Sequence, residues 1–350
     1  ESAGIETGQS PAADMSSLGR ELFEILAPAG LREKIAKART LYIVPTGPLY
    51  LLPFEALTTG ESRFLLEERS VSYLSSASLL KILRDTESRK KEKAKNPLLA
   101  FANPVYGAQR TTPTPKPGPG DGIKPGTGLE ITRIADLRTA AYRDYFGGSF
   151  LELPDTEDEA RKIKAILQAP DQSRPLQLRD AASRSNVLRL NDENRLNDYR
   201  FVVFACHGVL PGEVNQVKQP ALVLSHPDPQ TGQEGFLTMA DVFGLKLNAD
   251  LVTLSACNTG RGEMQAGEGV VGLARAFMYA GSPALSVTLW SVESKSATLL
   301  STGLHKGLKE GKSRAEALRE AKLRLLRGEA GAFYRHPFCW APVVLFGDGQ

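Results

Sequence analysis

Residues 201–208, Phe-Val-Val-Phe-Ala-Cys-His-Gly, and residues 251–260, Leu-Val-Thr-Leu-Ser-Ala-Cys-Asn-Thr-Gly, decide the fold. Each stretch opens with a short apolar run, typical of a strand buried on both faces of a parallel sheet. Each run leads to a reactive side chain, His207 in the first stretch and Cys257 in the second. The carboxyl ends of parallel strands meet at one edge of an open α/β sheet, where ligands collect. Two neighbouring strands would therefore bring the imidazole and the thiol together.

Apolar runs and amphipathic segments alternate along the rest of the chain, which predicts a three-layer αβα sandwich with a mostly parallel sheet. Strands are expected at 41–45, 50–53, 70–74, 98–103, 176–178, 221–224, 284–289 and 343–346, and helices at 77–89, 156–167, 183–190, 238–243, 268–280 and within 295–327. The helix at 156–167 opens with Thr156-Glu157-Asp158-Glu159, a pattern that indicates a capping box.

The same pattern divides the chain into three regions. Residues 1–15 are small and polar and are expected to be a disordered tail or the edge of a longer protein. Residues 16–96 are expected to form an amino-terminal subdomain, and residues 97–350 the main domain. A stretch at 105–128 is rich in Pro and Gly and predicts a long surface loop in the main domain.

Composition narrows the class of protein. The 350 residues are 41% hydrophobic and 24% charged, which is ordinary for a soluble globular protein. Because 43 basic and 40 acidic residues are mostly interspersed, no nucleic-acid partner is predicted. We find no apolar run of the roughly 18 residues that cross a membrane, so a cytoplasmic protein is expected. The three cysteines lack Cys-x-x-Cys spacing, which argues against a disulfide framework or a metal site, and no cofactor is expected.

The interval from His207 to Ala256-Cys257 is similar to that of caspases, whose histidine lies roughly 50 residues before the nucleophile. Further motifs follow one another in order along the chain: Leu41–Phe54, Leu153–Glu157, Phe204–Gly208, Leu237–Asp241, Ser255–Gly260, Gly267–Gly269, Leu289–Val292 and His336–Asp348. This ordered series resembles the CHAT family, which comprises caspase-like cysteine peptidases related to separases and often attached to tetratricopeptide repeats. The resemblance implies a caspase-haemoglobinase-like fold.

The resemblance also assigns roles at the site. It implies that Cys257 is the nucleophile, His207 the general acid and base, and the amides of Gly208 and Cys257 the donors of an oxyanion hole. This allotment suits thiol chemistry, because a thiolate attacks a carbonyl, backbone donors stabilise the oxyanion and imidazole protonates the leaving amine. No third carboxylate is evident in the sequence, so we expect a dyad oriented by a backbone carbonyl. Cys206 should point to the opposite face and belong to the core.

The segment after the expected strand at 284–289 would form the substrate pocket. Trp290, Val292, Glu293 and Ser294 are the candidates there. Separases have a similar segment, but they carry an acidic residue at the position that aligns with a serine in this chain. Glu293 could substitute, yet a shift of one residue turns a strand side chain to the other face. The departure favours a pocket for small, polar or apolar residues over one for a basic residue.

These observations lead to a hypothesis of limited proteolysis. The chain is expected to be a cysteine endopeptidase that cuts a protein or peptide substrate, as a bacterial signalling or defence effector regulated by a tetratricopeptide-type or other domain. One alternative is a catalytically inactive interaction module with the same fold. A second is a nucleotide-binding regulator, based on the G-x-G-x-x-G pattern at 267–272. That pattern lies past its strand, so a tight loop beside Cys257 is favoured over nucleotide binding.

Overall fold

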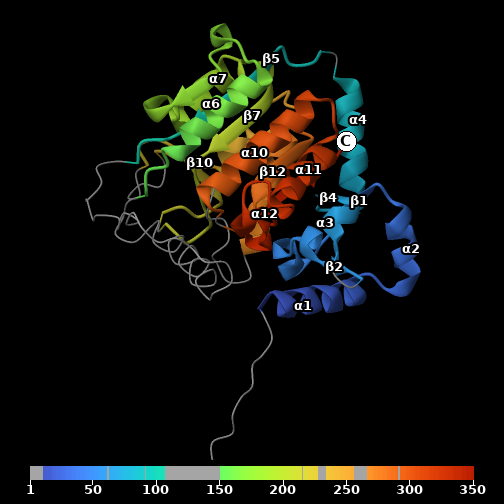
Figure 1. Ribbon diagram of the computed structural model, residues 1–350. Coiled ribbons are helices and arrows are strands. Elements are labelled where there is room, and N and C mark those ends of the chain that lie inside the picture. Colours follow the sequence, from blue (N-terminus) through green and yellow to red (C-terminus); the bar gives the residue numbers. More distant parts are fainter. Residues whose placement is uncertain are drawn as a thin grey trace, which may run out of the picture.

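The computed structural model describes residues 11–60, 63–90, 92–106, 150–214, 216–227, 234–255, 266–290 and 292–350, with the backbone alone for 11–16 and 266–270. Its centre is an eight-stranded sheet (Figure 1). In spatial order the strands are β1 (Thr40–Ile43), β4 (Ser70–Tyr73), β13 (Val343–Gly347), β12 (Ala284–Thr288), β11 (Leu251–Leu254), β7 (Tyr199–Ala205), β5 (Asn96–Ala102) and β6 (Leu176–Leu178). Only the pair of β12 and β13 is antiparallel among the neighbours described in this sheet.

Helices cover both faces of the sheet. One face packs against α6 (Asp155–Leu167), α10 (Ser294–Lys309) and α11 (Arg314–Leu326). The other packs against α7 (Arg184–Asp192), α8 (Met239–Phe243) and α9 (Ala266–Ala280). The predicted three-layer αβα sandwich with a mostly parallel sheet is therefore confirmed. The remaining helices are α1 (Pro11–Leu26), α2 (Ala29–Lys37), α3 (Leu65–Glu68), α4 (Ala77–Arg89) and α12 (Pro337–Trp340), and the small strands are β2 (Thr58–Thr59), β3 (Arg63–Phe64), β8 (His207–Val209), β9 (Ala221–Val223) and β10 (Phe236–Thr238).

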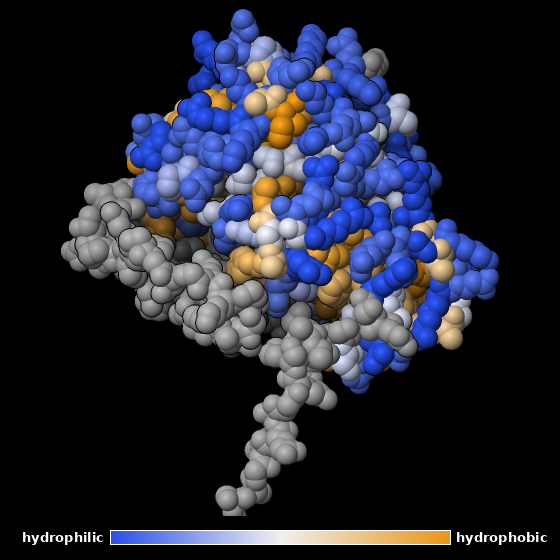
Figure 2. All heavy atoms as spheres, in the orientation of Figure 1, coloured by the Kyte–Doolittle hydropathy of each residue, from blue (hydrophilic) through white to orange (hydrophobic). Residues whose placement is uncertain are grey.

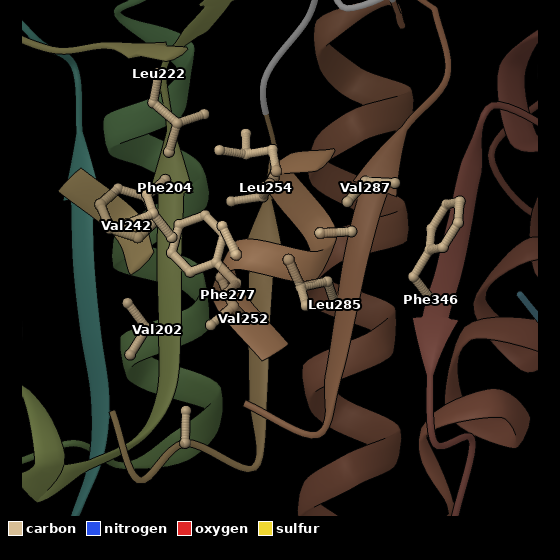
Figure 3. Close-up of a cluster of buried hydrophobic side chains, with 14 of the residues drawn as sticks. Val202, Phe204, Leu222, Val242, Val252, Leu254, Phe277, Leu285, Val287 and Phe346 are labelled. Carbon is tan, nitrogen blue, oxygen red and sulfur yellow. The ribbon is translucent and has the colours of Figure 1, made fainter. Parts of the chain in front are cut away.

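Burial on both faces explains why β7 is apolar from Phe201 to Ala205. Phe201 and Val203 face the α6 and α10 layer, whereas Val202 and Phe204 face the α7 and α9 layer. Figure 3 shows Val202, Phe204 and neighbouring side chains of this second core, with Phe277 of α9 among them. A strand buried on both faces has no solvent-exposed face, so its side chains are apolar on both sides. The outer surfaces of the helices are mostly hydrophilic on the side seen in Figure 2.

Some local expectations were wrong. The run at 50–53 is not a strand, because Gly47–Leu51 forms a 3-10 helix in which Pro48 takes one of the first positions. The capping box at Thr156 is also absent, since α6 begins one residue earlier, after Pro154. The Thr156 hydroxyl instead donates to the carbonyl of Leu153 at 2.7 Å. The strand at 221–224 exists as β9 but pairs with β8 and β10 in a separate small sheet.

The expected regions map onto this architecture as follows. Residues 1–10 lie outside the described residues, and α1 begins at Pro11, inside the segment 1–15 that was expected to be a tail. Proline suits the first turn of a helix because no hydrogen bond is lost there. Most of the Pro/Gly-rich stretch at 105–128 also lies outside the described residues. The boundary at residue 96 stays a prediction, although β1 and β4 extend the same sheet as the strands that follow it.

Candidate active site

His207 is separated from the end of β7 by Cys206 alone and is the first residue of β8. Its side chain is almost fully buried, with 2% of its surface exposed. The imidazole packs against two aromatic rings that also contact each other, with centroid distances of 5.0 Å to Tyr106 and 5.6 Å to Phe150. Its Nε2 lies 2.8 Å from the carbonyl oxygen of Leu151. The ring is thus fixed by segments far away in the sequence.

The contact with Leu151 sets the chemistry of the imidazole. A carbonyl oxygen can only accept a hydrogen bond, so Nε2 of His207 carries a proton and donates it. Nδ1 is then the nitrogen that can exchange a proton during a reaction. This contact agrees with the expected orientation by a backbone carbonyl. The backbone of His207 is also held, because its amide donates a hydrogen bond of 3.1 Å to the Tyr106 hydroxyl. That hydroxyl in turn donates to the carbonyl of Val223 at 3.1 Å.

β11, the strand that leads to Cys257, lies beside β7 and runs parallel to it. Phe204 is paired with Leu254, and the amide of Ser255 donates to the carbonyl of Phe204 at 2.9 Å. His207 and Cys257 each follow one member of this pair by three residues in the sequence. The expectation of two adjacent parallel strands is therefore confirmed. Cys257 itself lies outside the described residues, as does its amide.

Three other sequence-based expectations can be placed. Gly208 lies in β8, opposite Leu222 of β9, and its role as an oxyanion donor stays a prediction. Cys206 is fully buried within the core cluster on the α7 and α9 side. The glycine pattern at 267–272 lies within α9, whereas a dinucleotide site requires it in the turn between a strand and a helix. This placement argues against the nucleotide-binding alternative.

The segment after β12 mainly forms the start of α10 rather than an open pocket. Trp290 is half-buried and stacks on Phe338, with ring centroids 6.2 Å apart. Val292 is buried. Glu293 is the N-cap of α10, and its carboxylate accepts hydrogen bonds from the amides of Lys295 at 3.1 Å and Ser296 at 2.9 Å. Because both of its oxygens serve the helix, Glu293 is a poor candidate for a specificity acid.

A small cavity of about 100 Å³ lies at this edge of the sheet. Ser294 is the only one of the four expected pocket residues in its described lining. The lining residues are Glu152, Leu153, Pro154, Asp155, Thr156, Glu159, Cys206, Ser255, Ser294, Ala297 and Thr298. The cavity therefore adjoins His207 through Cys206, and it adjoins the end of β11 through Ser255.

Glu159, in the second turn of α6, is a buried acid that the sequence analysis treated as part of a capping box. Only 2% of its surface is exposed, and its Oε2 accepts a hydrogen bond of 3.1 Å from the Ser255 hydroxyl. Burial raises the pKa of Glu159 to about 7, against a weaker lowering by the nearby Ser301 and Ser255 hydroxyls. One signal in the sequence could have revealed it. Glu159 precedes Ile163 by four residues, so both share the buried face of the helix.

Comparison with known proteins places the chain in a family. The model of the CHAT domain matches residues 16–348, nearly the whole chain. The chain belongs to the CHAT domain family. It is also 33% identical over 116 residues to tetratricopeptide repeat protein 28 of Homo sapiens and 32% identical over 116 residues to that of Mus musculus. Each match covers 33% of this chain, but only 4% of the human protein and 5% of the mouse protein.

Two solved structures resemble this CHAT domain distantly. One is the separase–securin complex of Saccharomyces cerevisiae, at 11% identity and a TM-score of 0.43, covering 87% of this chain and 15% of that chain. The other is the Arg-specific cysteine proteinase gingipain R, at 9% identity and a TM-score of 0.46, covering 99% of this chain and 69% of that chain. Within the described residues, no helix is both long and apolar enough for a membrane span, and we find no cluster of three potential metal ligands.

Proposed function

We propose that this CHAT domain is a cysteine endopeptidase in which Cys257 is the nucleophile and His207 the general acid and base. The observation that carries the proposal is the parallel pairing of β7 with β11, whose carboxyl ends lead to these two residues. Ligand sites of open α/β sheets lie at such ends. The second support is the imidazole of His207, held by the carbonyl of Leu151 in the tautomer that leaves Nδ1 to exchange protons.

The proposed reaction has two stages. Nδ1 of His207 accepts the thiol proton of Cys257, and the thiolate attacks the peptide carbonyl to form a tetrahedral oxyanion, with the amides of Gly208 and Cys257 as the proposed donors. The C–N bond then breaks as Nδ1 gives its proton to the leaving amine, which leaves a thioester. Water, deprotonated by the same nitrogen, hydrolyses the thioester and restores the thiol.

The proposed substrate is a protein partner cut at a limited number of sites. The small cavity of about 100 Å³ beside the site supports selectivity, because it restricts which side chains of a substrate can enter. The curated relatives are tetratricopeptide repeat proteins by name, which supports an attached regulatory domain of that kind. A role as a cytoplasmic bacterial signalling or defence effector belongs to the same proposal.

Cleavage of a positional-scanning peptide library tests the proposal. We expect the wild-type chain to cleave a subset of peptides, Cys257→Ala to be inactive, and His207→Ala to lose about 10²- to 10⁴-fold in kcat/KM. Cys339→Ala is the matched control, since this buried thiol lies against the carbonyl of Phe333 and outside the proposed site. Cleavage that survives Cys257→Ala would refute the thiol assignment, whereas a wild-type chain that cleaves no peptide of the library would favour the inactive interaction module.

A further inference from the structure

The carboxyl end of β11 is held from two directions. The backbone amide of Ser255 bonds to β7 through the Phe204 carbonyl at 2.9 Å. Its hydroxyl donates to Oε2 of Glu159 at 3.1 Å, across the boundary between the sheet and α6. Ser255 precedes Cys257 by two residues in the sequence, so this pair of bonds fixes the last described point before the proposed nucleophile.

Burial of the Glu159 carboxyl group costs free energy that a purely structural role at this place would not require. Its other oxygen, Oε1, is buried and has no hydrogen-bond partner within the described part of the chain. An apolar side chain of similar size would avoid the cost of desolvating a carboxyl group, and such replacements of buried charge are often neutral or stabilising. A buried, half-satisfied acid beside a candidate site is instead characteristic of a group with a functional task.

The groups that face Glu159 leave its charge uncompensated. On its own side of the cavity are Asp155 and Glu152, and Glu152 pairs with Arg179 at 2.8 Å. From α10 comes the Ser301 hydroxyl. His305, one turn further along α10, packs against the Phe201 ring and is neutral, because burial lowers its pKa to about 4. Cys206, after the end of β7, also lines the cavity, although its side chain belongs to the core on the α7 and α9 side.

We propose that Glu159 is a positioning residue of the peptidase site, which rests on the proposed function: through the Ser255 hydroxyl it fixes the end of β11 that leads to Cys257, most firmly as a carboxylate. A hydrogen bond to an ionised acceptor is shorter and roughly twice as strong as one to a neutral acceptor. Protonation of Glu159 therefore loosens the junction, and a small displacement of a reacting group lowers the rate steeply. The effect belongs in kcat, because substrate binding does not require the nucleophile to be aligned.

The test compares Glu159→Gln, Ser255→Ala and the double variant with wild type across pH. Glu159→Gln keeps the shape and an acceptor but never ionises. We expect the ratio of wild-type to Glu159→Gln kcat to rise as pH increases through about 7, the pKa of Glu159, with little change in KM. The ratio cancels the titration of His207 and Cys257. Ser255→Ala should lower kcat by about ten- to a hundredfold, and the double variant should be no worse than Ser255→Ala alone.

Asp158→Asn is the matched control, because Asp158 lies on the same helix but is exposed and pairs with Lys162 at 2.6 Å. Its ratio to wild type should not vary with pH. Losses that multiply in the double variant would mean that Glu159 does not act through Ser255, and a ratio for Glu159→Gln that stays flat with pH would overturn the role of its charge.

A second readout separates this inference from the proposed function. The rate at which iodoacetamide alkylates Cys257, followed by mass spectrometry of that peptide, reports the surroundings of the thiol without any cleavage. We expect Glu159→Gln and Ser255→Ala to shift its pH profile alike. If the profile shifts but no Cys257-dependent cleavage is found, the proposed function fails while Glu159 still positions Cys257. If cleavage depends on Cys257 and neither readout responds to the two substitutions, the positioning role is overturned and the peptidase remains.

Discussion

The buried carboxyl of Glu159 makes the stability of the fold depend on pH. Its pKa is about 7 in the folded chain against an ordinary value of 4.5, because burial disfavours the charged form. As pH rises from about 4.5 to 7, the unfolded chain releases this proton first, so the free energy of unfolding falls. The stability that the neutral acid contributes is present below about pH 4.5 and lost above about 7, and its full size is roughly 3 kcal/mol.

The substitution Glu159→Gln removes this pH-dependent contribution to the free energy of unfolding. Relative to wild type, we expect the variant to gain stability between pH 5 and pH 8, by up to roughly 3 kcal/mol at the upper end. Urea unfolding of both proteins at several pH values measures the difference, in which all other titrating groups cancel. Curves for the two proteins that run parallel across this range would show that Glu159 is ionised, or neutral, throughout.

His207 and Glu159 differ in how far the sequence predicted their positions at the candidate site. His207 was predictable, because a histidine at the end of an apolar strand is a recognisable chemical pattern. Its hydrogen bond to Leu151 was not, since Leu151 comes from a segment with no periodicity to place it. Glu159 was missed because acids at a helix start ordinarily cap the helix or face water. The spacing of four residues to Ile163 puts Glu159 on the apolar face of α6, and the packing of α6 on the sheet buries that face.

At the scale of elements, strands and helices with a strong period were predicted well. Local pattern fails where proline dictates a turn, as it did at Gly47–Leu51, where Leu49 and Tyr50 pack against the core without extended backbone. The local pattern also does not predict which sheet a short strand joins. β9, for example, joins the small sheet with β8 and β10. Pairing depends on contacts between segments far apart in sequence, which periodicity does not encode.

One pair of elements is joined by a buried ion pair. Lys322 of α11 donates to Glu55 at 2.8 Å, with 1% and 3% of the two side chains exposed. The hydroxyl of Tyr73 in β4 donates to the same carboxylate at 2.5 Å. Burial lowers the pKa of Lys322, and the attraction of Glu55 opposes that shift. The pair therefore links the segment before β2 to a helix near the end of the chain.

Breaking this pair should destabilise the fold strongly. Lys322→Met leaves the Glu55 carboxylate buried without its cation, and we expect a loss of about 3–5 kcal/mol in the free energy of unfolding. The double variant with Glu55→Gln should recover part of that loss, because no charge is then left buried. Lys306→Met, which removes an exposed lysine of α10, is the control and should change stability by less than about 0.5 kcal/mol. Denaturant unfolding measures all three, and similar losses for both lysines would contradict the account.

At the scale of the whole molecule, the sheet combines residues from both ends of the chain. β13, close to the carboxyl terminus, lies between β12 and β4, and Phe346 is paired with Tyr73. The same two rings are 5.5 Å apart within the core. Sequence alternation predicted the layers but not this order, because strand order is set by how the layers close rather than by local pattern. The region 16–96 is thus built into the sheet that positions the site.

This arrangement predicts how the chain responds to truncation. A fragment of residues 97–350 lacks β1 and β4, leaves the edge of β13 unpaired and leaves Lys322 buried without Glu55. We expect it to aggregate or unfold, since an exposed apolar strand edge and an orphaned buried charge both favour non-native states. A fragment that starts at Arg39 keeps both strands and should remain folded with reduced stability. Circular dichroism and thermal unfolding compare the two. Cooperative unfolding of 97–350 at the temperature of the full chain would instead establish 16–96 as a separate subdomain.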